Sequence, residues 1–427
     1  MNNSQTREPN NNSMLGVHLQ APTGIAHGLL FLIILSIPWV KLELIGRVAL
    51  TDILFACLVF VLYAQYTIAQ WRLKFQGSPP AFFLFCLSLW VISALASGFN
   101  AHHLDAYISD SLGIIYLAVL GLIFALLAAQ NEKFLESVLR WLRYSLAIVI
   151  IVGFAGVLFT VLTKQYNLFF YSDANKLIAT FRFPNQLGGY LVLFLPLLCE
   201  EIVKSERAAH RVGYGILLIL LLIDLVASGS RSALMAALFA GMVYFAINSI
   251  KVNIRLILGA SILALIVYVL ALVLSNYVEV IQRAFSALHS VILQGQITDE
   301  FRLMNWALAF SIFQESPWVG YGVGNVQYDY VFEIHNSYLS VLAEMGIVGV
   351  AALLYLVGYI GFTTCQNMRL AHKANSLAWV GTTRAFFVGF LTEAVYLTQH
   401  QMLRSRFLWL FFGLVVALNM ILKSKGK

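Results

Sequence analysis

The sequence predicts an all-α polytopic membrane protein, and its composition and hydropathy carry that prediction. Of the 427 residues, 60% are hydrophobic and 11% are charged, and the mean hydropathy is +0.82. A soluble domain has roughly 25% charged residues, so a chain this apolar is expected in lipid. The first 20 residues are polar and show no cleavable signal pattern. The first apolar segment is therefore predicted to stay in the membrane as a span.

About twelve segments have the apolar content and approximate length of a membrane span, which needs roughly 17–25 residues. They are 25–40, 48–68, 81–98, 108–130, 144–163, 188–203, 212–228, 233–250, 256–278, 342–364, 377–398 and 407–422. The even number predicts that both chain ends lie on one side. The predicted organisation is a polar tail at 1–24, spans one to nine at 25–278, an external helical region at 279–341, spans ten to twelve at 342–422, and a second tail at 423–427.

The basic residues predict the orientation of these spans. Sixteen of the 27 lysines and arginines fall in one set of loops and in the two tails, ten fall in the other set, and Arg384 lies within a span. The richer set is predicted to be cytoplasmic by the positive-inside rule. Much of the net charge of +7 is then an orientation signal, so we expect no nucleic-acid partner. The cytoplasmic loops are short and carry no nucleotide-binding motif, so no nucleotide is expected either.

The segment 279–334 is the longest polar region and is predicted to form a helical lid on the membrane surface between spans nine and ten. Within it, 299–314 predicts an amphipathic helix that ends before Ser316-Pro317. The apolar stripe of this helix follows a three-to-four spacing: Leu303, Trp306, Ala307, Phe310 and Phe313. The glycines at 320, 322 and 324 follow no strand, so they predict turns. His335-Asn336 is predicted to open the next helix.

Arg231 lies inside Ser228-Gly229-Ser230-Arg231-Ser232, between two apolar segments. A guanidinium does not lose its proton, and at membrane depth it is costly unless it has a ligand or a partner. The small neighbours leave room for a ligand against the backbone. An arginine whose side chain reaches out to the membrane interface is the alternative interpretation.

Arg302 and His335 also have two interpretations each. Arg302 is either an anion ligand beside the apolar stripe of its helix or a solvated charge. His335 is either an interface or capping histidine or a general base, because a neutral imidazole is the usual base near neutral pH.

The remaining polar candidates divide between structural and binding roles. Arg182 either stacks on a flanking phenylalanine or binds an anion, and Asn185, after Pro184, is a candidate cap for the next span. Arg404 is an interfacial anchor or part of a weak anion site. Glu344 and Glu393 favour pairing with an arginine over acid catalysis, and Tyr338 favours an aromatic membrane belt over sugar stacking.

No metal or other cofactor is predicted. A metal site needs clustered carboxylates or a set of histidines and carboxylates. The adjacent pair Asp299-Glu300 would not face one site on a helix, and His102-His103 with Asp105 forms only a weak candidate. We therefore expect arginines to supply the electrostatic stabilisation that a cation would give.

Taken in order, these motifs resemble the O-antigen ligase superfamily. They are Arg182-Phe-Pro-Asn185, Ser-Gly-Ser-Arg231-Ser, Arg302 followed by Trp306, Pro317-x-x-Gly320-x-Gly322-x-Gly-Asn325, and His335-Asn336-Ser-Tyr338-Leu. The resemblance covers most of the chain and is strongest from about 180 to 350. It implies that Arg231, Arg302 and His335, the last as general base, are the catalytic residues. Residues predicted to bind the diphosphate or the glycan are Arg182, Asn185, Asn336, Tyr338 and Arg404.

The resemblance implies a glycosyltransferase with its site at the periplasmic face of the bacterial inner membrane. The expected reaction is an inverting, metal-independent transfer of a glycan from undecaprenyl diphosphate to a sugar hydroxyl of lipid A–core, in lipopolysaccharide biosynthesis. An O-antigen ligase proper is favoured, because the chain lacks the large outer domain of the protein-glycosylating branch. The alternatives are a polysaccharide polymerase, a protein O-oligosaccharyltransferase and, outside enzymes, a flippase or transporter of the lipid-linked glycan. Paired halves with corresponding broken helices would favour the transporter, and the sequence shows no such pair.

Overall fold

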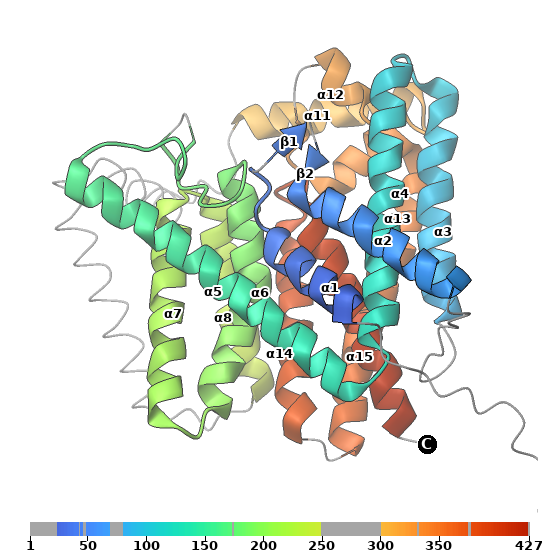
Figure 1. The fold of residues 1–427 in the computed structure, drawn as a ribbon. Helices are drawn as coiled ribbons and strands as arrows, with labels where there is room; N and C mark the ends of the chain where they lie inside the picture. Colours follow the sequence, from blue (N-terminus) through green and yellow to red (C-terminus); the bar gives the residue numbers. More distant parts are fainter. Residues whose placement is uncertain are drawn as a thin grey trace, which may run out of the picture.

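The computed structural model confirms the predicted helical class. The residues that it describes are 24–41, 43–45, 48–68, 80–172, 175–248, 300–330, 333–374 and 377–425. Most of them lie in α-helices (Figure 1). Outside the helices, a short hairpin of β1 (Glu43–Ile45) and β2 (Val48–Ala49) follows the first helix, where an all-α chain had been predicted.

Seven helices in the described part of the chain are long and apolar enough to cross a membrane. They are α3 with the 3-10 turn η1 (Ala81–Asn100), α4 (Leu104–Ala128), α5 (Glu132–Thr163), α6 (Pro184–Lys204), α7 (Ala208–Ala227), α13 (Ser337–Lys373) and α15 (Arg406–Lys425). Three shorter apolar helices are α1 (Gly24–Ser36), α2 (Leu50–Ile68) and α8 (Arg231–Asn248). The helix α14 (Leu377–Tyr396) matches the eleventh predicted span but carries both Arg384 and Glu393. The ninth predicted span, 256–278, lies outside the described residues, so the total of twelve stays a prediction.

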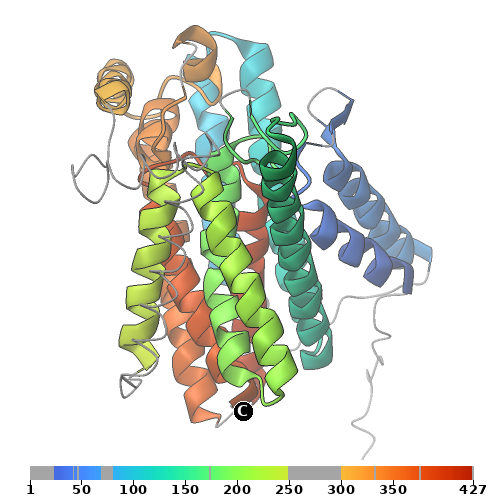
Figure 2. The same ribbon diagram turned by 90° about the vertical axis from the view of Figure 1, so that its left-hand side faces the viewer.

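The helix α15 forms the centre of the bundle. Every residue from Phe407 to Leu422 is buried, and a helix that is apolar on all sides is expected to be enclosed by protein or lipid. It packs against α4, α13 and α5. On the other side of the molecule α6 packs against α7, α8 and α14, and Figure 2 shows these helices running side by side. The second group of helices positions the Arg231 segment.

The predicted site segments share one end of the bundle. In Figure 1 the helices α11 (Glu300–Glu315) and α12 (Asn325–Tyr330) lie at the top with the hairpin, whereas the C-terminal end lies at the bottom. The turns between α4 and α5 and between α6 and α7 are also at the bottom. This arrangement follows the predicted alternation of loops. The side that faces the periplasm stays a prediction.

A break in α13 shapes the site end of the bundle. Gly346 has a φ of +62° inside this helix, so the helix is kinked there. The glycine-rich loop fills the break: the amides of Tyr321 and Gly322 donate to the carbonyls of Ala343 and Glu344 at 2.9 and 3.0 Å. The glycines at 320, 322 and 324 all have positive φ, which confirms their predicted role in turns.

The helix α11 confirms the predicted element, and its packing shows which of its faces is buried. It ends directly before Ser316, as expected. However, Leu303 and Phe310 from the predicted stripe are 53% and 50% exposed, and Ala309 and Ile312 are the buried residues instead. They join a small core with Val326, Ile334 and Ala343. The contact of α11 with α13 selects this packed face. Leu303 and Phe310 stay exposed, and contact of the predicted stripe with the membrane surface stays a prediction.

Candidate functional site

The Ser228–Ser232 turn joins α7 to α8, and Arg231 is the first residue of α8. Gly229 has a φ of +61°, and the aliphatic stem of Lys176 lies 3.6 Å from the point where a Cβ atom at Gly229 would be. The Ser230 hydroxyl donates to Asn185 Oδ1 at 3.0 Å. The turn is thus held in one conformation, with two basic side chains beside the amino end of α8.

His400 joins this turn to two other segments. Its Nε2 lies 2.5 Å from Ser232 Oγ, and its carbonyl accepts a hydrogen bond of 2.7 Å from the Ser337 hydroxyl at the start of α13. The His400 ring lies 6.2 Å from that of His335, between centroids, and its side chain is almost wholly buried. The α7–α8 turn, the start of α13 and the segment after α14 therefore meet at His400.

Arg302 and His335 lie in the same place. Arg302 donates from Nη1 to Gln399 Oε1 at 3.2 Å, one residue before His400. Burial lowers the pKa of His335, and the positive charge of Arg302 lowers that pKa further. Burial, together with the charges of Arg302 and His335, holds the pKa of His400 well below its ordinary value. Both imidazoles are therefore neutral at neutral pH. We call Arg302, His335, His400 and Ser232 the histidine site.

Asn336 and Tyr338 support the start of α13. As predicted, His335-Asn336 opens the helix: the Asn336 side chain caps it, accepting from the amides of Tyr338 and Leu339 at 3.0 Å each. The Tyr338 hydroxyl donates to the carbonyl of Ala394 at 3.2 Å, which ties α13 to α14. Substrate binding by these two residues stays a prediction.

Asn185 does not cap α6, contrary to the prediction. Phe183 occupies the capping position in an extended conformation, and Pro184 is the first helical residue. Proline suits that position because its missing N–H would have no partner within the helix. The Asn185 side chain instead accepts from Ser230 of the α7–α8 turn, and its carbonyl accepts from the Tyr396 hydroxyl at 2.9 Å. Asn185 thereby connects α6 with both the α7–α8 turn and α14.

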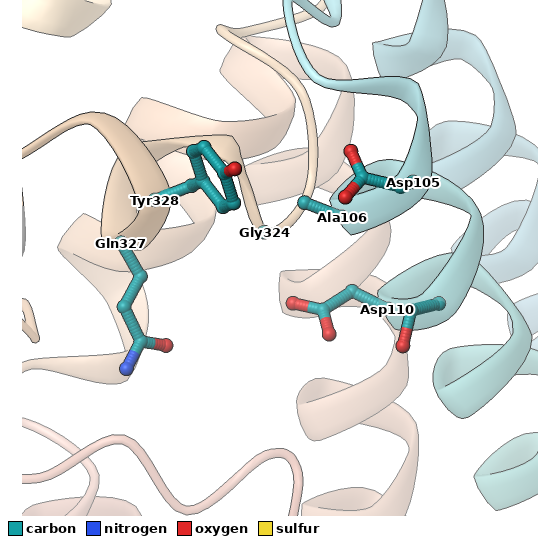
Figure 3. Close-up of a pocket in the computed structure, with 7 residues that line it drawn as sticks. Asp105, Ala106, Asp110, Gly324, Gln327 and Tyr328 are labelled. Atoms are coloured by element: carbon teal, nitrogen blue, oxygen red, sulfur yellow. The ribbon is translucent and has the colours of Figure 1, made fainter.

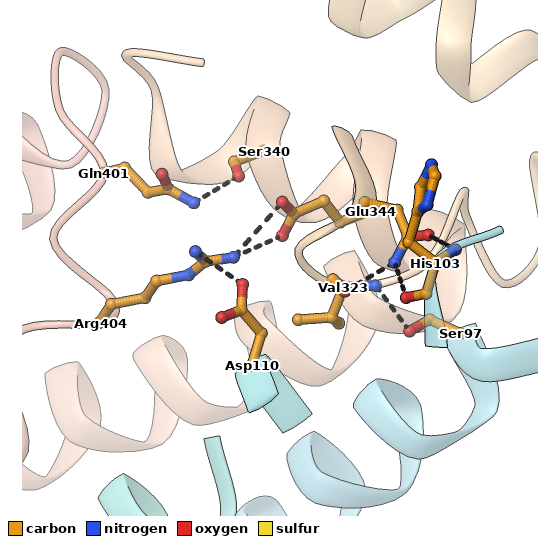
Figure 4. Close-up of polar contacts among 9 residues, drawn as sticks. Ser97, His103, Asp110, Val323, Ser340, Glu344, Gln401 and Arg404 are labelled. Carbon is orange, nitrogen blue, oxygen red and sulfur yellow. Dashed lines mark hydrogen bonds and ion pairs between the residues drawn. The ribbon is translucent and has the colours of Figure 1, made fainter. Parts of the chain in front are cut away.

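Arg182 and Arg404 lie in different environments. Arg182 is exposed, and its guanidinium carbon lies 5.7 Å from the centroid of the Phe183 ring, as in the stacking alternative. Arg404 forms ion pairs with Asp110 at 2.9 Å and Glu344 at 3.3 Å (Figure 4). We call Arg404, Asp110 and Glu344 the Arg404 cluster.

The Arg404 cluster confirms that Glu344 pairs with an arginine. Within the described part of the chain, the buried carboxylate of Glu393 has no hydrogen-bond partner, so its predicted pairing is not found. Anion binding by Arg182 and Arg404 stays a prediction.

His102 and His103, the weak metal candidate with Asp105, both contact Asp329. His103 Nε2 lies 2.5 Å from Asp329 Oδ1, and His102 Nδ1 lies 3.9 Å from Asp329 Oδ2. Both histidines thus face an aspartate of α12. Among the described residues, no group of three histidines, cysteines or carboxylates could hold a metal ion. The absence of a metal from the reaction stays a prediction.

Three polar residues at the histidine site and the neighbouring α7–α8 turn were not predicted from the sequence. Gln399 and His400 lie in the segment between α14 and α15, and Lys176 lies in the loop before α6. A signal existed for the first two, because the polar run Gln399-His400-Gln401 interrupts apolar sequence at the predicted site end. Lys176 gave no comparable signal, since its approach to Gly229 depends on how the loop folds back over the turn.

Fold and site together define a polytopic helical membrane protein that gathers arginine and histidine at one end. The family model described as O-antigen ligase matches residues 216–354, so this segment is similar to that family. The match confirms the predicted resemblance to that superfamily. It contains Arg231, Arg302 and His335, whereas His400 lies beyond its end. No curated protein matches the chain.

Proposed function

We propose that this protein is an O-antigen ligase that transfers a glycan from a polyprenyl diphosphate to a sugar hydroxyl of lipid A–core. The observation that carries the proposal is the meeting of Arg302, His335 and the Arg231 turn through His400. The family match and the apolar helices support glycan transfer at a membrane. Undecaprenyl diphosphate is the proposed donor lipid.

The diphosphate would bind between the turn and α11. Arg231 is the first residue of α8, and the amino end of a helix attracts anions through its free N–H groups and its dipole. Arg302 approaches from α11. Arginine can form two parallel hydrogen bonds to phosphate, so these side chains would stabilise the charge that develops on the leaving diphosphate.

His335 would act as the general base. Its lowered pKa keeps the imidazole unprotonated, as a base requires. The acceptor hydroxyl would pass its proton to His335 while its oxygen bonds to the anomeric carbon. The bond from that carbon to the phosphate oxygen breaks in the same step, releasing polyprenyl diphosphate. Attack opposite the leaving group inverts the anomeric configuration. A bound diphosphate would also raise the pKa of His335, which strengthens the base when substrate is present.

The proposed setting is the bacterial inner membrane, with twelve spans, both termini in the cytoplasm and the histidine site facing the periplasm. The asymmetry of basic residues supports this orientation. The broken helix α13 is the observation that favours the transporter alternative, because carriers bind substrates at such breaks. Here the glycine-rich loop occupies the break, which favours the enzyme.

The experiment is a reaction with purified protein, undecaprenyl-diphosphate-linked glycan and lipid A–core in detergent. A ligase gives glycosylated lipid A–core, a polymerase lengthens the lipid-linked glycan, and a flippase gives neither product. The last two outcomes would reject the ligase proposal. Adding EDTA tests the metal-free mechanism, which predicts unchanged turnover. Activity that is lost with EDTA and restored by a divalent cation would overturn that part.

A further inference from the structure

A cavity opens between α4 and α12 at the same end of the molecule as the histidine site. Its volume is about 470 Å³, within the roughly 300–1,000 Å³ typical of small-molecule sites. Figure 3 shows side chains of the two helices on opposite sides of the space. The lining residues are Asp105, Ala106, Ser109, Asp110, Gly324, Gln327 and Tyr328. We call this space the α4–α12 cavity.

The chemistry of its lining suits a neutral sugar. Carboxylates, a hydroxyl and an amide can accept and donate hydrogen bonds to neighbouring sugar hydroxyls. The ring of Tyr328, whose residue is 56% exposed, offers a flat apolar face to the C–H groups of a sugar ring. None of the seven lining residues is a lysine or an arginine. Asp105 would repel a phosphate, so the cavity does not suit the diphosphate.

The walls of the cavity are fixed without a ligand. The Asn325 side chain accepts from the His103 amide at 2.6 Å and donates to the His103 carbonyl at 3.3 Å, which fastens α12 to the start of α4. The ring of His103 lies 4.2 Å from that of Tyr328, between centroids, and this contact supports the Tyr328 ring. A wall that is already ordered loses little conformational freedom when a ligand binds.

A short segment of chain links the wall of the cavity to the histidine site. Asp110 in its wall pairs with Arg404, which is four residues after His400 along the chain. At about 3.8 Å per residue, the Cα atoms of His400 and Arg404 are at most about 15 Å apart. Gln401 between them donates to Ser340 of α13 at 2.8 Å. An oligosaccharide bound in the cavity would have to extend over about the distance between His400 and Arg404 to reach the histidine site.

We propose that the α4–α12 cavity binds neutral sugar residues of a glycan substrate, away from the bond that is transferred. This inference rests on the proposed function, because only a glycan-processing site needs a sugar subsite nearby. Donor glycan and acceptor core both present such sugars, and the experiment below separates these two sources.

Binding is tested first, without catalysis. The full chain in detergent is titrated with the free oligosaccharide released by mild acid from its lipid-linked glycan, and contact is followed by saturation-transfer NMR. We expect Asp105→Asn and Tyr328→Ala each to weaken binding about tenfold, as for the loss of a good hydrogen bond or a ring contact. Glu315→Gln, an exposed carboxylate outside the cavity, serves as the matched control and should bind like wild type. His335→Ala should also bind like wild type.

Transfer is measured next with matched substrates. With full-length donor and acceptor, Asp105→Asn and Tyr328→Ala should raise KM about tenfold and leave kcat nearly unchanged. If the sugars come from the donor, the defect disappears with a donor that carries a single sugar. If they come from the acceptor, it disappears with a truncated core.

The outcomes separate the two proposals. Oligosaccharide binding that both cavity variants weaken, without any transfer by wild type, would support the cavity and reject the ligase function. Normal transfer with equal binding by wild type and both cavity variants would support the ligase and reject the cavity. Tighter binding of glucose 6-phosphate than of glucose, if it is kept in Arg231→Ala and Arg302→Ala and lost in both cavity variants, would also overturn the neutral-sugar assignment.

Discussion

The histidine site and the Arg404 cluster both place arginine beside buried polar groups, but with different effects. Arg404 lies between the carboxylates of Asp110 and Glu344, so its charge is balanced by the protein itself. In the histidine site, Arg302 donates to the neutral amide of Gln399, and its charge lowers the pKa of both His335 and His400. The comparison indicates that the first arginine stabilises the fold, whereas the second modifies the groups proposed for catalysis.

The largest effect is expected from His335→Ala. Loss of a general base should lower the transfer rate by about 10²–10⁴. Turnover of purified protein with donor and acceptor measures it, with His372→Ala at the opposite end of α13 as the control. Turnover close to wild type would show that His335 is not the base. The histidine site would then differ from the Arg404 cluster in its contacts but not in a catalytic role.

The next largest effect is expected from Arg231→Lys and Arg302→Lys. Lysine keeps the charge but cannot form the two parallel hydrogen bonds of arginine, so each change should lower kcat by about 10²–10³. Single-turnover transfer separates this effect from product release. Equal rates for lysine and arginine at both positions would mean that charge alone suffices.

Arg404→Ala should mainly affect stability. It would leave two carboxylates without their cation, and removing one partner of a buried ion pair costs about 3–5 kcal/mol. Since the Arg404 side chain is 34% exposed, we expect roughly the lower end of that range. Thermal unfolding in detergent measures the loss, which Arg404→Lys should partly restore. A wild-type melting temperature with a strongly raised KM would instead assign Arg404 to substrate binding, as the sequence predicted.

A smaller effect is expected at His400, which we regard as a positioning residue. His400→Ala removes the contact with Ser232 and should lower kcat/KM about tenfold, whereas His400→Gln can place a nitrogen near the same position and should restore most of it. A double-mutant cycle with Ser232→Ala should show non-additive losses. Additive losses would show that His400 and Ser232 act independently.

The smallest effect concerns pH. A base with a lowered pKa stays unprotonated until the pH falls below its ordinary value of about 6.5. The acid limb of kcat/KM should therefore lie below that pH in wild type. Arg302→Gln removes a charge that lowers the pKa of His335, so the limb should move to higher pH. Movement to lower pH would contradict the electrostatic link between Arg302 and His335.

Much of the architecture could be predicted from the sequence, because membrane spans depend on local hydropathy. Described helices overlap eleven of the predicted spans, although α5 begins 12 residues before its predicted span and α13 ends 9 residues after its own. The helix α11 and the glycine turns appeared where local signals placed them. The buried face of α11 could not be predicted, since apolar residues occur on more than one of its sides. The capping of α6 was also missed, because the helix begins at Pro184 and Asn185 therefore lies inside it.

The sequence by itself determined the membrane class, the alternation of loops and the three residues proposed for catalysis, because each depends on local composition or an ordered motif. Only the tertiary structure decided that Gln399, His400 and Lys176 join that site, that Arg404 is held by two carboxylates, and that α4 and α12 enclose a cavity. The physical reason is that these contacts join segments far apart in the chain. The packing of α13, α14 and α15 determines which residues meet, and a local sequence pattern cannot predict that packing.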